Sequence, residues 1–148
     1  MTAIDVGYGQ LHWRLRSDPR VRVMERTNIR HLDAQLLEGK ADLACIDVSF
    51  ISLKIVVPAV LRCLKEPYRM ICLIKPQFEV GKGLVGKGGV VRDPALHQAV
   101  IKDVTRSLEK LQLQRLAITP SPILGPKGNQ EYLAYFKAGA SDRPTTNR

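Results

Sequence analysis

The sequence has no uninterrupted apolar run of the roughly 18 residues that a membrane-spanning helix needs. Its longest apolar stretch, near residues 55–61, is interrupted by Pro58. The N-terminal segment MTAIDVGYGQ lacks the basic stretch followed by an apolar one that marks a secretory signal. We therefore expect a cytoplasmic protein that does not enter a membrane.

Cysteine is scarce, and the three cysteines, Cys45, Cys63 and Cys72, form no CxxC or CxxxC pair. Their odd number and their spacing argue against a disulfide framework and against a metal site. Cys45 and Cys72 lie within the apolar runs LACID and MICLI. We expect both to be small buried side chains, and we expect no bound metal.

Acidic residues are outnumbered: 14 Asp and Glu face 23 Lys and Arg, which gives a formal net charge of +9. A positive excess favours polyanionic partners such as nucleic acid, although many basic proteins bind none. The 148 residues suffice for one domain and are too few for two. Nothing in the sequence indicates an oligomeric state.

Short apolar runs alternate with segments of helical periodicity. Strands are expected near residues 3–6, 21–24, 42–48, 69–74, 116–119 and 131–136. Helices are expected at 10–16, at 33–37, from a cap at Ser52 to about residue 64, and after Asp93-Pro94. This order predicts an α/β fold with a mostly parallel sheet. Asp5, Asp47 and Lys75 fall at predicted strand ends, where such sheets bind ligands.

Five phrases are unusual, and they occur in a fixed order: AIDVGYGQL (3–11), IDVSFISL (46–53), LIKPQFEVGK (73–82), GKGGVVRDPALH (86–97) and TPSPILGPKGNQEYL (119–133). Together they resemble the TlyA or hemolysin A branch of the FtsJ-like ribose 2′-O methyltransferases. Members of that family act on ribosomal RNA and use S-adenosylmethionine. The resemblance extends to about Lys137 and implies a Rossmann-like methyltransferase fold.

The resemblance also implies a catalytic set of two lysines, an aspartate and a glutamate. Asp47 resembles its aspartate, Lys75 its second lysine and Glu131 its glutamate. The first lysine, the first strand with its glycine-rich cofactor turn, and a small RNA-binding domain would lie upstream of Met1. We therefore expect a partial methyltransferase domain over residues 1–137 that lacks its first strand, followed by a disordered tail at 138–148.

These residue types suit methylation of a ribose hydroxyl. A lysine with a pKa of ~10.4 in water becomes a base only when its surroundings favour the neutral amine. We interpret Lys75 as the base or as the group that orients the hydroxyl, with Asp47 and Glu131 fixing its direction. Taken alone, an aspartate such as Asp47 is more often a turn cap and a lysine such as Lys75 more often solvated, and Glu131 is also consistent with an ordinary surface acid.

The resemblance assigns the cofactor to a second group of residues. Asp5 is similar to the acid that holds the ribose hydroxyls of S-adenosylmethionine, and Asn28 could face its adenine, with Asp47 close to both. The alternative for Asp5 is an ordinary turn aspartate before Gly7.

A loop rich in glycine and lysine, residues 81–89, lacks the spacing of a Walker phosphate loop. We interpret it as a mobile RNA-binding loop in which Lys82, Lys87 and Arg92 supply charge, the alternative being a solvated loop. For the whole chain, we keep open an inactive remnant that still binds RNA. A membrane-active hemolysin is disfavoured because the chain has no strongly amphipathic basic helix.

Overall fold

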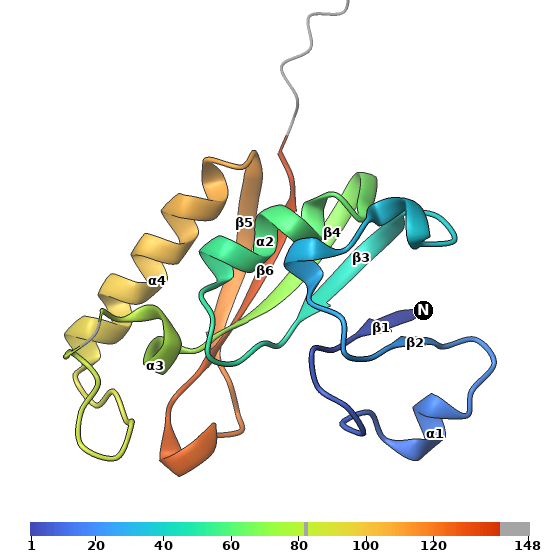
Figure 1. Cartoon of the computed structure of the whole chain (residues 1–148). Coiled ribbons are helices and arrows are strands. Elements are labelled where there is room, and N and C mark those ends of the chain that lie inside the picture. The colour runs from blue at the N-terminus through green and yellow to red at the C-terminus, as the bar shows by residue number, and fades with distance from the viewer. Residues whose placement is uncertain (82, 140–148) are drawn as a thin grey trace, which may run out of the picture.

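The computed structural model describes residues 1–81 and 83–139 (Figure 1). The strands are β1 (Thr2–Ile4), β2 (Arg22–Met24), β3 (Ala41–Ile46), β4 (Leu64–Ile74), β5 (Leu113–Pro120) and β6 (Tyr132–Ala138). The α-helices are α1 (Trp13–Arg16), α2 (Leu53–Leu61), α3 (Pro76–Glu79) and α4 (Pro94–Glu109). Short 3-10 turns are η1 (Ile29–His31), η2 (Ala34–Leu36) and η3 (Pro126–Gly128).

The main sheet is mixed, so the expectation of a mostly parallel sheet was wrong. Its strand order is β3-β4-β6-β5. β3 pairs with β4 in parallel, whereas β6 runs antiparallel to both β4 and β5. The reason lies in the connection between β5 and β6, which is a turn-rich segment with no α-helix, and such a link joins antiparallel neighbours.

β1 and β2 form a separate parallel pair, in which Thr2 lies opposite Arg22 and Ile4 opposite Met24. Asp5 extends the pairing because its amide donates to the carbonyl of Met24. Among the described residues, the second edge of β1 and the outer edge of β3 pair with no strand. The outer edges of β2 and β5 are also unpaired among the described residues, so the two sheets have four open strand edges.

Two helices begin where their caps predict. The hydroxyl of Ser52 accepts from the amide of Lys54 at the start of α2, and Asp93 accepts from Ala95 at the start of α4, ahead of Pro94. α2 continues through Pro58 and ends at Leu61, earlier than expected. The chain then enters β4 at Leu64, which is longer than its apolar part suggested.

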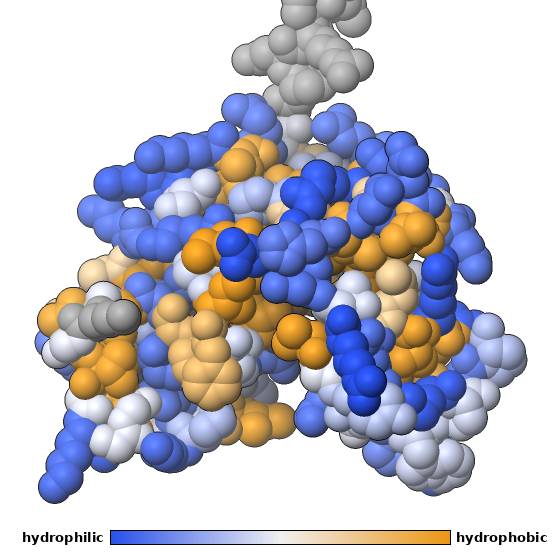
Figure 2. All heavy atoms as spheres, in the orientation of Figure 1, coloured by the Kyte–Doolittle hydropathy of each residue, from blue (hydrophilic) through white to orange (hydrophobic). Residues whose placement is uncertain are grey.

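The core lies between the main sheet and one helical layer. Met70, Cys72 and Ile74 of β4 and Ala134 and Phe136 of β6 are fully buried against the inner faces of α2 and α4. Both helices cover the same face of the sheet (Figure 1). On this side, hydrophobic atoms reach the surface only in separate clusters among hydrophilic ones (Figure 2). Cys45 is exposed, so its predicted burial was wrong, because it points away from this layer.

Candidate functional site

The site lies at the carboxyl ends of the parallel strands β3 and β4. Asp47 follows β3, and Lys75 follows β4, with Ile46 and Cys72 paired just before them. The Nζ of Lys75 lies 2.6 Å from Oδ1 of Asp47 and donates to Oγ of Ser49 at 3.1 Å. Lys75 is buried, whereas the side chain of Asp47 is 70% exposed. Asp47 and Ser49 thus orient the buried amine of Lys75 close to the protein surface.

Glu131 lies just before β6, the strand that pairs with β4. Ile74 pairs with Tyr132, so the same antiparallel register places Glu131 opposite Lys75. Its carboxylate is buried, with a 5% exposed residue surface, and accepts from Nε2 of Gln77 at 2.8 Å. We expected both Asp47 and Glu131 to bind Lys75. Within the described residues Glu131 forms no ion pair, so only Asp47 binds the amine. Asp47 holds the amine directly, and Gln77 holds Glu131 nearby.

Two neighbours determine where the carboxylate of Glu131 can go. Gly125 lies against it and leaves no room for a larger side chain. Gln77 donates from one side, while its own Oε1 is buried with no hydrogen-bond partner among the described residues. Such an orphaned acceptor beside a carboxylate is uncommon in protein interiors.

Glu79 joins the segment after β4 to the segment after β3. Its Oε2 accepts from the hydroxyl of Ser52 at 2.6 Å, and its Oε1 accepts from the amide of Leu53 at 2.8 Å. Burial raises the pKa of Glu79, and the two hydrogen bonds oppose that shift. Asp47 and Lys75 lie in the two segments that Glu79 joins. Glu79 therefore helps to keep these two residues in contact.

An exposed aromatic residue directly follows Ser49, the hydrogen-bond partner of Lys75. Phe50 is 90% exposed and has a left-handed backbone, with φ of 62°. Its ring lies 4.8 Å from that of Phe78, centroid to centroid, and the ring planes are tilted by 50°. A solvated phenylalanine in a backbone conformation that favours glycine is costly, so its placement points to a contact outside the chain.

Asp5 and Asn28 lie close together because the amide of Thr27 donates to the carbonyl of Asp5. Oδ1 of Asp5 accepts from the amide of Gly7 at 2.7 Å, and Oδ1 of Asn28 accepts from Arg30 at 3.0 Å. Each side chain therefore closes a local turn. Within residues 1–81 and 83–139, Oδ2 of Asp5 and Nδ2 of Asn28 have no hydrogen-bond partner, so one polar atom of each remains available.

The end of the glycine-rich loop is anchored to Asn129, two residues before Glu131 in the segment that leads into β6. Oδ1 of Asn129 accepts from the amide of Val91 at 3.1 Å, and its Nδ2 donates to the carbonyl of Gly89 at 2.9 Å. Nε2 of His97 donates to the carbonyl of Val91, which leaves Nδ1 to accept from the hydroxyl of Tyr132. His97 therefore links the residues after the loop to Tyr132 of β6.

The predicted RNA-binding residues differ in what the structure says of them. Lys87 and Arg92 are exposed on the loop and form no ion pair with any other described residue. Lys82 lies outside the described residues. Gly86 starts a tight turn, because its amide donates to the carbonyl of Val90 at 3.1 Å. The cations are thus displayed on a loop whose far end is fixed.

The profile of the family described as FtsJ-like methyltransferase matches residues 1–138 of the chain. The chain belongs to this family. The TlyA 16S/23S rRNA (cytidine-2′-O)-methyltransferase of Mycobacterium tuberculosis is 47% identical over 137 residues, which are 93% of this chain and 51% of that protein. Hemolysin A of Brachyspira hyodysenteriae is 36% identical over 135 residues, 90% of this chain and 56% of its own length. The chain thus spans about half the length of these TlyA and hemolysin A relatives.

Solved structures support the same membership. A protein of Streptococcus thermophilus, provisionally named a hemolysin, superposes with a TM-score of 0.89 at 40% identity, over 97% of this chain and 54% of that one. The N-methyltransferase NodS of Bradyrhizobium japonicum, in complex with S-adenosyl-L-homocysteine, superposes with a TM-score of 0.60 at 14% identity, over 94% of this chain and 66% of that one. The second match shows the fold alone, which is that of S-adenosylmethionine-dependent methyltransferases.

For this FtsJ-like chain, sequence reasoning missed the residues that hold the named ones in place. Ser49, Gln77, Glu79 and Asn129 all lie inside the phrases that carry the resemblance. The length of those phrases could have indicated such supporting residues, because the phrases are longer than three candidate side chains require. No described helix is long and apolar enough to cross a membrane, and residues 1–81 and 83–139 hold no cluster of three or more candidate metal ligands.

Proposed function

We propose that this chain provides part of an enzyme that methylates a ribose 2′-hydroxyl in ribosomal RNA with S-adenosylmethionine. The observation that carries the proposal is the contact between Lys75 and Asp47 at the carboxyl ends of β3 and β4. Membership of the FtsJ-like family and the printed activity of the TlyA relatives support the same reaction.

In this proposal Lys75 binds the attacking hydroxyl. Asp47 and Ser49 fix the nitrogen so that it points to one position, where it orients the hydroxyl or, as the neutral amine, takes up its proton. Glu131, held by Gln77, supplies a second anchor for the sugar. Positioning of this kind contributes much of the rate in a transfer between two bound molecules.

The residues at the ends of β1 and β2 fit the cofactor. The free carboxylate oxygen of Asp5 suits a pair of ribose hydroxyls, and the free amide nitrogen of Asn28 suits a ring nitrogen of adenine. Asp47, mostly exposed, lies where it could accept a further hydrogen bond. When bound, S-adenosylmethionine supplies an electrophilic methyl group on a sulfonium.

The RNA would approach across the loop cations Lys82, Lys87 and Arg92. These contact phosphates and set affinity without reading the sequence. Phe50, next to Ser49 in the chain, offers a flat apolar surface on which a nucleobase can stack. The two kinds of contact together would present one sugar to the amine.

The test is transfer of tritium-labelled methyl groups from S-adenosylmethionine to ribosomal subunits. We expect Lys75→Ala to abolish transfer, while Lys65→Ala, which removes an exposed lysine paired with Asp42, leaves it unchanged. Ribose methylation is located by reverse-transcription stops at low nucleotide concentration. Transfer that survives Lys75→Ala would rule out the proposed mechanism.

The open edges of β1 and β3 favour one alternative, a chain that binds RNA without methylating it. Unpaired strand edges leave backbone groups unsatisfied, so we expect weak cofactor binding and marginal stability in this chain. The alternative predicts retention of ribosomal RNA on a filter with no methyl transfer. Calorimetry that detects tight binding of S-adenosylmethionine to the isolated chain would contradict it.

A further inference from the structure

Gln77 belongs to the short helix α3, two residues after Lys75, and only one end of its amide forms a hydrogen bond. Its Nε2 donates to Oε1 of Glu131 at 2.8 Å, while its Oε1 is buried with no partner among the described residues. A buried amide oxygen without a donor is destabilising, because it has lost its contact with water and gained nothing in return. The contact with Glu131 is therefore kept at a cost in stability.

Lys75 and Glu131 carry opposite charges and occupy opposite positions at the ends of two paired strands. Ile74 pairs with Tyr132, and Lys75 keeps an extended backbone, with φ of −114° and ψ of 98°, so the antiparallel register continues to Glu131. Side chains in such positions are close enough to interact. Both residues are buried, and buried charges normally pair. No ion pair joins these two in the part of the chain that the structure describes.

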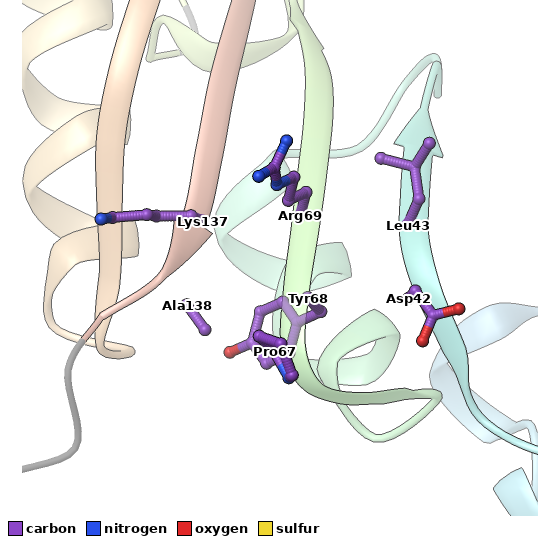
Figure 3. A pocket seen from close by; sticks show the side chains of 7 residues that line it. All are labelled: Asp42, Leu43, Pro67, Tyr68, Arg69, Lys137 and Ala138. Carbon is purple, nitrogen blue, oxygen red and sulfur yellow. The ribbon is translucent and has the colours of Figure 1, made fainter.

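The other end of the same two strands shows a register pair that is separated by repulsion. Arg69 and Lys137 lie directly opposite each other and line a hollow of about 370 Å³. The side chain of Lys137 extends away from that of Arg69 (Figure 3). Like charges in this position repel, which accounts for their divergence. Between Lys75 and Glu131 the force is attractive, so another contact must hold them apart.

The contacts of Glu131 show which residue keeps its carboxylate from Lys75. The backbone of Glu131 is fixed, because its carbonyl accepts from the amide of Ser121 at 2.8 Å. Gly125 lies against the carboxylate and closes one side. Among the described residues, Gln77 alone donates a hydrogen bond to this carboxylate. Without Gln77, the side chain of Glu131 would be free to turn toward Lys75.

We propose that Gln77 is a positioning residue that withholds Glu131 from Lys75. Bound to Gln77, the carboxylate of Glu131 keeps Oε2 without a partner among the described residues, so Oε2 can accept from a sugar hydroxyl. The ammonium of Lys75 likewise keeps one N–H after its contacts with Asp47 and Ser49. A direct ion pair would use both groups and leave neither for a hydroxyl, which accepts and donates at once. The role in methyl transfer rests on the proposed function, whereas the withheld ion pair is a property of the folded chain alone.

A purely structural Gln77 would have the opposite effect on stability. If its hydrogen bond mainly satisfied the buried carboxylate of Glu131, removing that bond would destabilise the chain. If Gln77 withholds Glu131, its removal frees the carboxylate to pair with Lys75 and also removes the orphaned oxygen. The sign of the change in stability therefore separates the two roles.

The test replaces Gln77 by methionine in the full chain, because methionine is unbranched, flexible and has no strong donor or acceptor. We expect the equilibrium constant for unfolding of Gln77→Met to be about tenfold smaller than that of the wild type, as one charge-assisted contact would give. Urea denaturation measures it. Gln98→Met, on the exposed side of α4, is the matched control and should leave it unchanged.

A double-mutant cycle between Lys75→Met and Glu131→Gln measures the ion pair itself. We expect almost no coupling in the wild type, because the two side chains do not pair there. In the Gln77→Met background the coupling should reach about tenfold in the unfolding constant. If Gln77→Met does not fold, as judged by circular dichroism, Gln77→Leu takes its place, and failure of both variants to fold would overturn the proposal.

The transfer of tritium-labelled methyl groups to ribosomal subunits should fall about hundredfold or more in Gln77→Met, although that variant is the more stable protein. A wild type that transfers no methyl group would refute the proposed function alone, and the coupling would still decide whether Gln77 withholds Glu131. Lower or equal stability of Gln77→Met, an absence of coupling in its background, or methyl transfer equal to that of an active wild type would each overturn the proposal.

Discussion

A β-carbon added to Gly125 would lie 2.2 Å from Oε1 of Glu131, which is closer than two such atoms approach in proteins. The glycine has a φ of −73°, so it is required there for its lack of volume rather than for its conformation. The buried carboxylate of Glu131 can therefore occupy its position only because Gly125 has no side chain.

Gly125→Ala should therefore displace Glu131 and break its contact with Gln77. We expect a loss of about 1–3 kcal/mol in the free energy of unfolding, the usual cost of overpacking, and loss of any methyl transfer. Urea denaturation measures the first effect. Gly81→Ala is the matched control, because a β-carbon at Gly81 meets nothing within 4 Å. Equal stability of the two variants would contradict the steric argument.

Glu79 predicts a dependence of stability on pH. Burial raises its pKa in the folded state, so the folded chain holds a proton that the unfolded chain has released. The stability that this proton contributes is complete below the unfolded pKa and is lost as pH rises through the folded pKa.

We therefore expect the free energy of unfolding of the wild type, minus that of Glu79→Gln, to fall as pH rises from the unfolded pKa of about 4.3 through the raised pKa of the folded state. Urea titrations at several pH values measure this difference. Glu109→Gln, at the exposed end of α4, controls for the loss of one carboxylate. A difference that stays flat or rises with pH would show that burial does not govern Glu79.

Two substitutions of Phe50 distinguish an effect on stability from an effect on RNA binding. Phe50→Gly and Phe50→Ala both remove the ring, but only glycine accepts the positive φ without strain. We expect Phe50→Gly to be the more stable of the two by about 1 kcal/mol. Both should weaken RNA binding by about 1–3 kcal/mol, the value of one stacked base. Ile123→Ala, an exposed apolar residue elsewhere, should leave RNA affinity unchanged.

Asn129→Ala should release the glycine-rich loop. The buried amide of Val91 would lose its acceptor, which costs about 1–3 kcal/mol. Trypsin should then cut after Lys87 faster than in the wild type. Asn129→Asp keeps an acceptor for Val91 but loses the donor to Gly89, so its cleavage rate should lie between the two. Equal cleavage of all three proteins would mean that the loop is held by other contacts.

Local rules predicted the elements well where one signal was strong. Ser52 and the Asp93-Pro94 pair start α2 and α4 as their capping chemistry requires. The antiparallel entry of β6 was missed because strand direction depends on the connection, and no helical pattern occurs between β5 and β6. β4 was predicted too short because Lys65, Glu66 and Pro67 interrupt its apolar pattern, although they lie at its exposed amino end.

The sequence named three residues that the structure brings together, but it did not predict the hydrogen bonds that hold them. The resemblance named Lys75, Asp47 and Glu131, and the strand register brings all three to one edge of the sheet. It did not indicate that Gln77 rather than Lys75 would bind Glu131, because side-chain partners depend on the precise turn after β4. The exposure of Cys45 was not predicted either, because it depends on which face of the sheet the helices cover.

The antiparallel return of β6 has a consequence for how the protein is made. Glu131 follows Lys75 by 56 positions in the chain. At a synthesis rate of about 5–20 residues per second, the lysine and its aspartate leave the ribosome roughly 3–11 s before the glutamate arrives. In a nascent chain, Lys75, Asp47 and α4 are therefore all made before Glu131, which is the last part of the site to be delivered.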